Sequence, residues 1–243
     1  MGKNCSGCRY FYEEKVHHHP RLMISEEEYD AFQKELQDFE EWLEENLHRE
    51  IDIHGVVDGI KPLFKKRVYE KGNGFSFSGF LIIFKQLYFG KDLMEDHVYA
   101  RVSSRTYASL KLGQGDVVTA RATLLLDRGR LVLKKLRRID IEARGEPPFW
   151  DESKALVARE TATHMPAQPE GCMQCPFGAL VDVEDLRNGQ TKKYRQLYCL
   201  RGMPHFLACD LYSHYSDSDE NLDESPPNSA ACTTRKVNVA GKT

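Results

Sequence analysis

The sequence predicts a mainly β protein with a helical N-terminal arm, a five-stranded Greek-key barrel and a small cysteine-rich metal-binding module. Three observations predict this class. An apolar stripe at helical spacing runs through residues 25–47, apolar and polar residues alternate between residues 49 and 141, and a Cys-x-x-Cys pair opens the last third of the chain. The 243 residues suffice for one large or two modest domains with a buried core.

Composition excludes a membrane-spanning helix. Hydrophobic residues make up 41% and charged residues 29% of the sequence, as in a soluble globular protein. No apolar run approaches the roughly 20 residues that span a bilayer, and the N-terminus lacks the apolar core of a signal peptide. We therefore expect no membrane partner and a cytoplasmic location.

Charge is segregated along the chain. The net charge is −3, but residues 1–48 carry −7, residues 49–145 carry +8 and residues 146–243 carry −4. A basic middle between acidic flanks predicts an anionic partner for the middle segment. The alternative is a basic surface that only keeps the domain soluble.

The N-terminal arm contains the clearest helix, from Ser25 to about Leu47. Ser25 is a good N-cap, and Glu28 three residues later completes a capping box. The stripe consists of Tyr29, Phe32, Leu36, Phe39, Leu43 and Leu47. It packs either on the protein's own core or on another molecule, so the helix is a possible site for a protein partner.

Strand patterns begin after this helix. A first strand alternates over residues 51–57, and the charged segment 61–71 that follows is expected to be a loop. Residues 75–89 form a long apolar strand with Gly79 as a bend or bulge site. In residues 98–105, Tyr99, Arg101, Ser103 and Arg105 are expected to share one face.

The stretch 115–141 reads as a β-hairpin. Two apolar runs flank a tight turn whose Gly129 can adopt positive φ. In the first arm Val118, Ala120, Ala122 and Leu124 point to one face, and Thr119, Arg121 and Thr123 point to the other. The second arm carries Lys134, Lys135, Arg137 and Arg138, more positive charge than a strand needs for solubility.

This order of elements resembles the OB-fold nucleic-acid-binding superfamily over about residues 49–142. The most specific element is the segment from Leu112 through Gly113, Gly115 and Asp116 into the hairpin. The resemblance implies the fold more strongly than the function. A barrel followed by a four-cysteine module also looks like the pairing in replication protein A, which binds single-stranded DNA.

These features predict single-stranded nucleic-acid binding, with DNA favoured over RNA. Cations would hold phosphates and an aromatic side chain would stack on bases. The expected binding residues are Lys65, Lys66, Arg67, Lys71, Tyr99, Arg101, Arg105, Arg121, Lys134, Lys135, Arg137 and Arg138. Taken singly, each basic residue is equally explained as a solvated surface charge.

Cysteine spacing predicts a metal site. Four thiolates, from Cys172, Cys175, Cys199 and Cys209, are the ligands of a closed structural Zn²⁺ site, and His205 could replace one of them. The wide spacing of the second pair also allows an iron–sulfur cluster. Cys5 and Cys8 could form a second site with His17, His18 and His19, or share the C-terminal one. Ordinary buried cysteines remain the alternative.

No catalytic motif is present in the sequence, so we expect a binding protein and not an enzyme. The alternative functions are a protein-interaction subunit of a nucleic-acid-processing complex and an iron–sulfur component of such a complex. The expected segments are the cysteine pair and acidic helix in 1–48, the barrel in 49–145, a linker with one short helix in 146–171, the metal module in 172–215 and a disordered acidic tail in 216–243.

Overall fold

The computed structural model of the protein describes residues 24–187 and 189–212, which fall into two compact units. The first unit comprises Met1–Pro62 and Ser78–Glu152, and the second comprises Leu63–Phe77 and Ser153–Thr243. The strands β1 (Glu50–Tyr69) and β2 (Gly72–Phe89) are long enough to contribute residues to both units.

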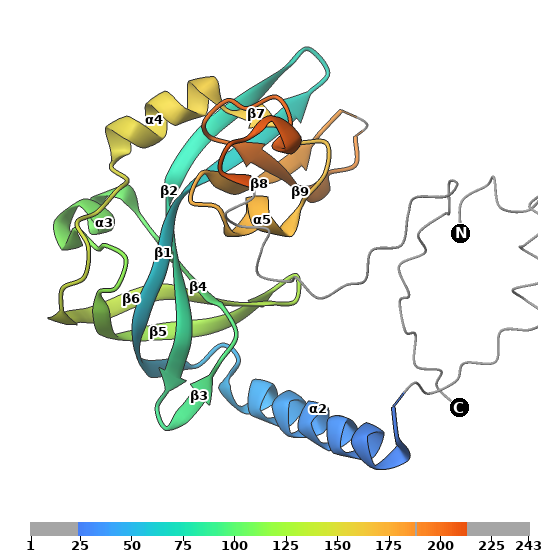
Figure 1. Ribbon diagram of the computed structural model, residues 1–243, viewed down its shortest axis with the longest axis vertical. Coiled ribbons are helices and arrows are strands. Elements are labelled where there is room, and N and C mark those ends of the chain that lie inside the picture. Colours follow the sequence, from blue (N-terminus) through green and yellow to red (C-terminus); the bar gives the residue numbers. More distant parts are fainter. Residues whose placement is uncertain (1–23, 188, 213–243) are drawn as a thin grey trace, which may run out of the picture. The chain divides into compact units, whose positions relative to one another are not determined.

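The first unit contains a closed ring of five strands. Their order is β2, β4, β6, β5 and β1, and pairing between β1 and β2 closes the ring (Figure 1). The bounds of the other three are Val98–Val102 for β4, Val117–Asp127 for β5 and Arg130–Ala143 for β6. Strand β4 runs parallel to β6, and its pairing with β2 is antiparallel. The short strand β3 (Asp92–Met94) extends the sheet beside β2.

The connectivity of this ring is OB-like, as the sequence predicts. The helix α3 (Ser104–Leu110) connects β4 to β5, and the β5–β6 hairpin completes the ring. Side chains alternate in β5, so Val118, Ala120, Ala122 and Leu124 are buried and the residues between them are half-buried. The buried face of the ring also includes Ile53, Val57, Phe80, Ile82, Phe84, Val98, Ala100 and Leu133.

A buried carboxylate fixes the entry to the hairpin. Asp116 is 1% exposed and accepts hydrogen bonds from the backbone N–H groups of Gly113 (3.0 Å) and Gly145 (2.7 Å). A side chain at Gly113 would lie 1.7 Å from the carbonyl oxygen of Glu146, so only glycine permits these two chain segments to approach so closely. Arg144 adds an ion pair of 3.2 Å to the same carboxylate.

The helix α2 (Glu26–Asn46) has the expected N-terminus, because Ser25 and Glu28 form the capping box. Among the described residues, side-chain contacts anchor the C-terminal end of this helix to the strands. Trp42 donates a hydrogen bond of 2.9 Å from Nε1 to Asp92 and packs edge-on against Phe89 at 5.3 Å. No residue of the helix is buried, so its apolar stripe does not pack on the core of its unit.

The second unit is a smaller β structure. Its strand β8 (Gly178–Asp185) pairs in parallel with the second half of β1 and antiparallel with β9 (Lys192–Cys199), and β7 (Thr163–His164) extends the sheet beyond β9. Phe64, 0% exposed, contacts Phe75 and Phe77 in its core. The unit also contains most of α4 (Glu152–Thr161), the helix expected in the linker, together with α5 (Glu170–Gln174) and the 3₁₀ helix η2 (Phe206–Ala208).

Two local expectations are wrong. Most of segment 61–71 is strand instead of loop, because the second half of β1 gains a pairing partner, β8, from more than 100 residues further along the chain. Ser103 and Arg105 do not continue β4. The Ser103 hydroxyl caps the helix α3 by accepting from the N–H of Thr106, and Arg105 lies within that helix.

Among the described residues no helix has both the length and the apolar character needed to cross a membrane.

Candidate nucleic-acid interface and cysteine cavity

The second arm of the hairpin contains two bulges with cationic residues. Lys135 (φ 55°) and Arg138 (φ 50°) adopt the left-handed conformation, which non-glycine residues rarely populate. The register confirms one extra residue at each place, since Thr123 pairs with Lys134, Arg121 with Arg137 and Thr119 with Asp140. Each step of two residues on β5 thus corresponds to a step of three on β6.

Because of these bulges, every third residue of this part of β6 points to the same face of the sheet, whereas in a regular strand every second residue does. Directly paired residues share a face of the sheet, so Lys134 and Arg137 stand on the outer face beside Thr123 and Arg121. Leu136 and Ile139 occupy the remaining positions and are half-buried. The repeat of two cations and one apolar residue therefore exposes Lys134, Lys135, Arg137 and Arg138, which we call the bulge cations.

The bulge cations make no hydrogen bond or ion pair within the described part of the chain, whereas Arg101 and Arg121 on β4 and β5 are paired with carboxylates. Arg121 donates to the two oxygens of Asp52 at 2.6 and 3.3 Å. These hydrogen bonds lower the pKa of Asp52, and the charge of Arg138 lowers it further. Binding of a phosphate by Arg121 would therefore compete with its hydrogen bonds to Asp52 on β1.

Tyr99 and Arg101 do share the outer face of β4, but β5 is not the neighbouring strand. Strand β6 lies between them, because β4 pairs with β6. Arg130 stacks over the Tyr99 ring at 5.3 Å, and Arg101 forms an ion pair of 2.7 Å with Asp127. The expected groove between β4 and β5 is therefore a three-strand face with β6 at its centre. Arg105 is exposed on α3.

The remaining predicted cations belong to the second unit. Lys65 and Arg67 pair with Glu184 at 3.9 and 3.0 Å, and these contacts lower the pKa of that carboxyl. Lys66 donates a hydrogen bond of 2.8 Å to the hydroxyl of Tyr198. Lys71 is exposed in the turn between β1 and β2.

An aromatic residue that the prediction missed lies on the same outer face. Tyr88 of β2 is 42% exposed, and its ring lies 6.2 Å from that of His54. His54 is paired with Thr119 in the ladder and contacts Glu142 at 3.4 Å. The signal was available in the sequence, because Tyr88 alternates with Leu87 and Phe89, which are both buried.

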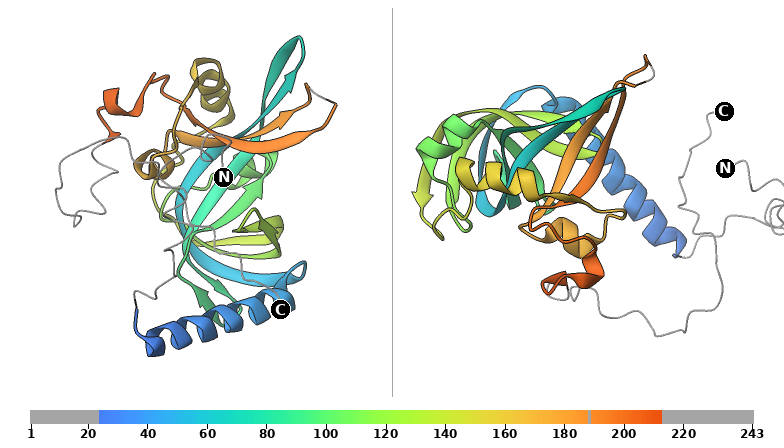
Figure 2. Two further views of the ribbon diagram at one scale, coloured as in Figure 1. Left: turned by 90° about the vertical axis from the view of Figure 1, so that its right-hand side faces the viewer. Right: turned by 90° about the horizontal axis from the view of Figure 1, so that it is seen from above.

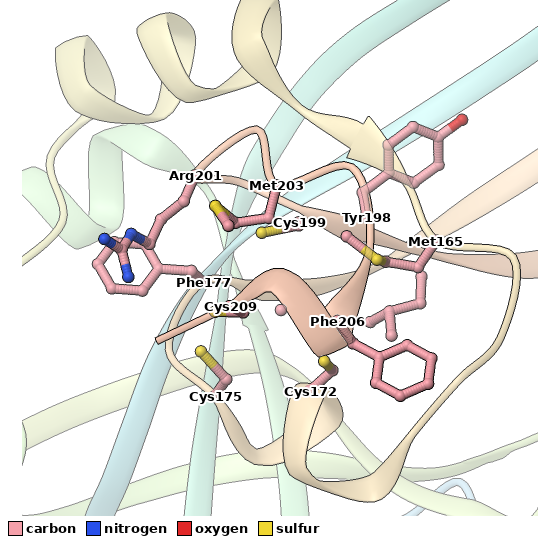
Figure 3. A pocket seen from close by; sticks show the side chains of 12 residues that line it. Met165, Cys172, Cys175, Phe177, Tyr198, Cys199, Arg201, Met203, Phe206 and Cys209 are labelled. Atoms are coloured by element: carbon pink, nitrogen blue, oxygen red, sulfur yellow. The ribbon is translucent and has the colours of Figure 1, made fainter. Parts of the chain in front are cut away.

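In the second unit, the four predicted cysteine ligands line one small cavity (Figure 3). Cys172 lies in α5, Cys175 caps that helix, Cys199 ends β9 and Cys209 caps η2. The cavity has a volume of about 20 Å³, enough for one water-sized occupant. Met165, Phe177, Leu197 and Phe206 also line it.

Two similar turns present these thiols. The N–H of Gly178 donates to the carbonyl of Cys175 at 2.9 Å, and the N–H of Gly202 donates to the carbonyl of Cys199 at 3.2 Å. A side chain at Gly178 would lie 1.7 Å from the carbonyl oxygen of Cys172, so this turn requires glycine. Each turn therefore places a glycine three residues after a cysteine.

The arrangement of the cysteines differs from a finished metal centre. In residues 24–187 and 189–212, no three side chains of Cys, His, Asp or Glu are grouped closely enough to hold a metal ion. The four described cysteines are half-buried. His205 does not line the cavity, and its Nδ1 accepts from the N–H of Leu207 at 3.2 Å. Cys5 and Cys8 lie outside the described residues.

Comparison with known proteins identifies no family for this chain. No family model and no curated protein matches it. Solved structures of Rim1, a mitochondrial single-stranded DNA-binding protein from S. cerevisiae, match 40–41% of this chain and 98–99% of their own length, with 12% identity and a TM-score of 0.24. A likeness at this level carries no inference about function.

Proposed function

We propose that the protein binds single-stranded nucleic acid, with DNA favoured over RNA, through the outer face of β2, β1, β5 and β6. The observation that carries the proposal is that the bulge cations are exposed and make no ion pair within residues 24–187 and 189–212. Four exposed positive charges within five residues form a concentrated site for an anionic polymer. On this proposal the protein acts by binding and not by catalysis.

The face offers two kinds of contact. The bulge cations would neutralise phosphates, which supplies affinity that depends on salt and not on base sequence. Tyr88 would stack on a base, a contact worth roughly 1–3 kcal/mol in single-strand complexes. A duplex keeps its bases stacked on each other, so this combination favours a single strand. DNA is placed ahead of RNA on the resemblance to replication protein A alone.

The test is binding of the full chain to labelled oligo-dT, oligo-rU and a duplex of equal length at several salt concentrations. Replacing Lys134→Ala and Arg137→Ala together should weaken oligo-dT binding roughly tenfold at low salt. It should also reduce the slope of log K against log[salt] by about 1.4, since each phosphate contact on a single strand contributes about 0.7. Tyr88→Ala should weaken binding without changing the slope.

The matched control is the double variant Lys192→Ala and Lys193→Ala, which removes two exposed cations from β9 in the second unit. It should bind oligo-dT as the original chain does. Equal losses in both double variants would show that only net charge matters, and an absence of salt-dependent binding would overturn the proposal. Tighter binding to oligo-rU than to oligo-dT would reverse the order of DNA and RNA.

We also propose that the cysteine cavity holds a structural Zn²⁺. The donor set supports this, because Cys172, Cys175, Cys199 and Cys209 line one cavity of about 20 Å³. Rotation about the Cα–Cβ bonds is the movement that would gather the thiols. As thiolates they would hold the ion, and the ion would then hold together the ends of β9, α5 and η2.

Metal analysis of the purified full chain tests this second proposal. One zinc per chain, lost on Cys199→Ser, is the expected result. Cys232, a cysteine outside the predicted ligand set, is the control, and Cys232→Ser should keep the zinc. If the anaerobically purified protein is brown, contains iron and absorbs visible light, the site holds an iron–sulfur cluster instead of zinc. Loss of zinc on Cys5→Ser would show a shared site. Absence of both metals would overturn the proposal.

A further inference from the structure

The N-terminal turns of α2 present an exposed apolar stripe. Tyr29, Phe32, Leu36 and Phe39 are 37%, 55%, 40% and 37% exposed. At 100° per residue these positions fall on one side of the helix. Figures 1 and 2 show this end of α2 projecting away from the strands of its unit, while the other end adjoins them. Large apolar side chains gathered on one exposed face mark an interaction surface.

The charges around the stripe indicate what kind of partner fits. The 21 residues of α2 contain ten acidic residues and one lysine, Lys34. Glu35 and Glu40 lie on opposite flanks of the stripe. An apolar surface bordered by carboxylates on both sides complements an apolar surface bordered by lysine or arginine.

The helix is also under electrostatic strain that such a partner would relieve. Acidic residues four apart, such as Glu40 and Glu44 or Glu41 and Glu45, repel each other. Glu44 and Glu45 lie in the last turn, at the negative end of the helix dipole, and no basic residue in that turn offsets their charge. A second copy of this helix would add nine further negative charges and is therefore disfavoured as the occupant.

We infer that α2 is a docking site for a basic amphipathic helix of a protein partner. The partner's apolar residues would pack on Phe32 and Leu36, and its cations would lie against Glu35 and Glu40. The anchoring pair of Trp42 and Phe89 would stay in place, because it lies at the other end of the helix. This inference is independent of nucleic-acid binding, which uses the outer face of the five-stranded ring.

The test uses the full chain and a synthetic 21-residue peptide with leucines at spacings of three and four and lysines elsewhere. Fluorescence anisotropy should show saturable binding. The double variant Phe32→Ser and Leu36→Ser should weaken it at least about tenfold, since two buried apolar side chains contribute more than 1.4 kcal/mol. Gln37→Ser, which changes a residue of α2 that lies off the stripe, is the control and should bind normally.

Four further measurements test the inference. A peptide of the same composition with scrambled leucines should bind at least about tenfold more weakly, since it presents charge without a stripe. Glu35→Gln with Glu40→Gln should weaken binding of the original peptide and reduce its salt dependence. The inference is overturned if both peptides bind alike. It is also overturned if sedimentation shows a dimer that Phe32→Ser dissociates, or if Phe32→Ser lowers the melting temperature, which would place a segment of the same chain on the stripe.

Discussion

Arg121 on β5 donates hydrogen bonds to both carboxylate oxygens of Asp52 on β1, at 2.6 and 3.3 Å. The two residues are also directly paired in the ladder. This ion pair engages the guanidinium of Arg121, which the sequence predicts to bind nucleic acid. The neighbouring Arg137 is paired with Arg121 across the other edge of β5 and has no carboxylate partner among the described residues.

This relationship predicts opposite effects for two variants. Arg121→Ala should change oligo-dT binding less than about twofold, because an exposed guanidinium already paired with a carboxylate adds little. Asp52→Asn should tighten binding and steepen the salt slope by about 0.7, because it frees one cation for a phosphate. Anisotropy titrations at three salt concentrations measure both. A large loss in Arg121→Ala would contradict the assignment.

At the bulge residue Lys135, one substitution is expected to change folding stability and nucleic-acid binding in opposite directions. Replacing Lys135 by Gly should raise the free energy of unfolding by about 1 kcal/mol, because glycine adopts positive φ without the steric cost borne by other residues. The same change should weaken oligo-dT binding, since it removes a bulge cation. Urea unfolding and anisotropy on one preparation give both values. Lys134→Gly, at a regular strand position, should lose stability instead.

The buried carboxylate of Asp116 predicts a strong effect on stability. Asp116→Ala should lower the free energy of unfolding by about 3 kcal/mol, because two backbone N–H groups and Arg144 lose a charged acceptor. Denaturant unfolding of the full chain measures the change. Asp140→Ala, an exposed carboxylate on β6, is the control and should stay within about 0.5 kcal/mol. Equal effects would contradict the assigned role.

Acid stability should depend on Asp185 at the end of β8. Hydrogen bonds from the side chain and backbone of Arg187 lower its pKa to about 2 from the ordinary value of 3.8. The unfolded chain therefore binds more protons in this range, so this contribution to stability is present above about pH 4 and is lost as the pH falls towards 2. Thermal melts of the original chain and Asp185→Asn should converge over this interval. A constant difference in melting temperature would contradict the prediction.

Much of the first unit was predictable from local pattern. The capping box set the start of α2, and alternation set the buried face of β5. The hairpin turn was also readable, since Arg128 and Gly129 both have positive φ as a tight two-residue loop requires. These features depend on neighbours within a few residues, so the amino-acid order contains the whole signal.

Other features depended on partners far away in the chain. The charged segment 61–71 reads as a loop because its residues are polar, but pairing with β8 makes most of it a strand. The bulges at Lys135 and Arg138 become visible only when β6 is aligned with β5. The pairing of Arg121 with Asp52 likewise requires the register of β1 and β5.

By itself, the sequence determined the acidic helix and the hairpin, and it identified the four cysteines of the candidate metal site. Only the tertiary structure decided which cations are available for a ligand, because a charge is cancelled by residues that may be 69 positions away, as Asp52 is from Arg121. It also decided that the stripe of α2 stays exposed. The local sequence pattern determines which residues of a helix or strand share a face, and tertiary packing determines which other residues that face contacts.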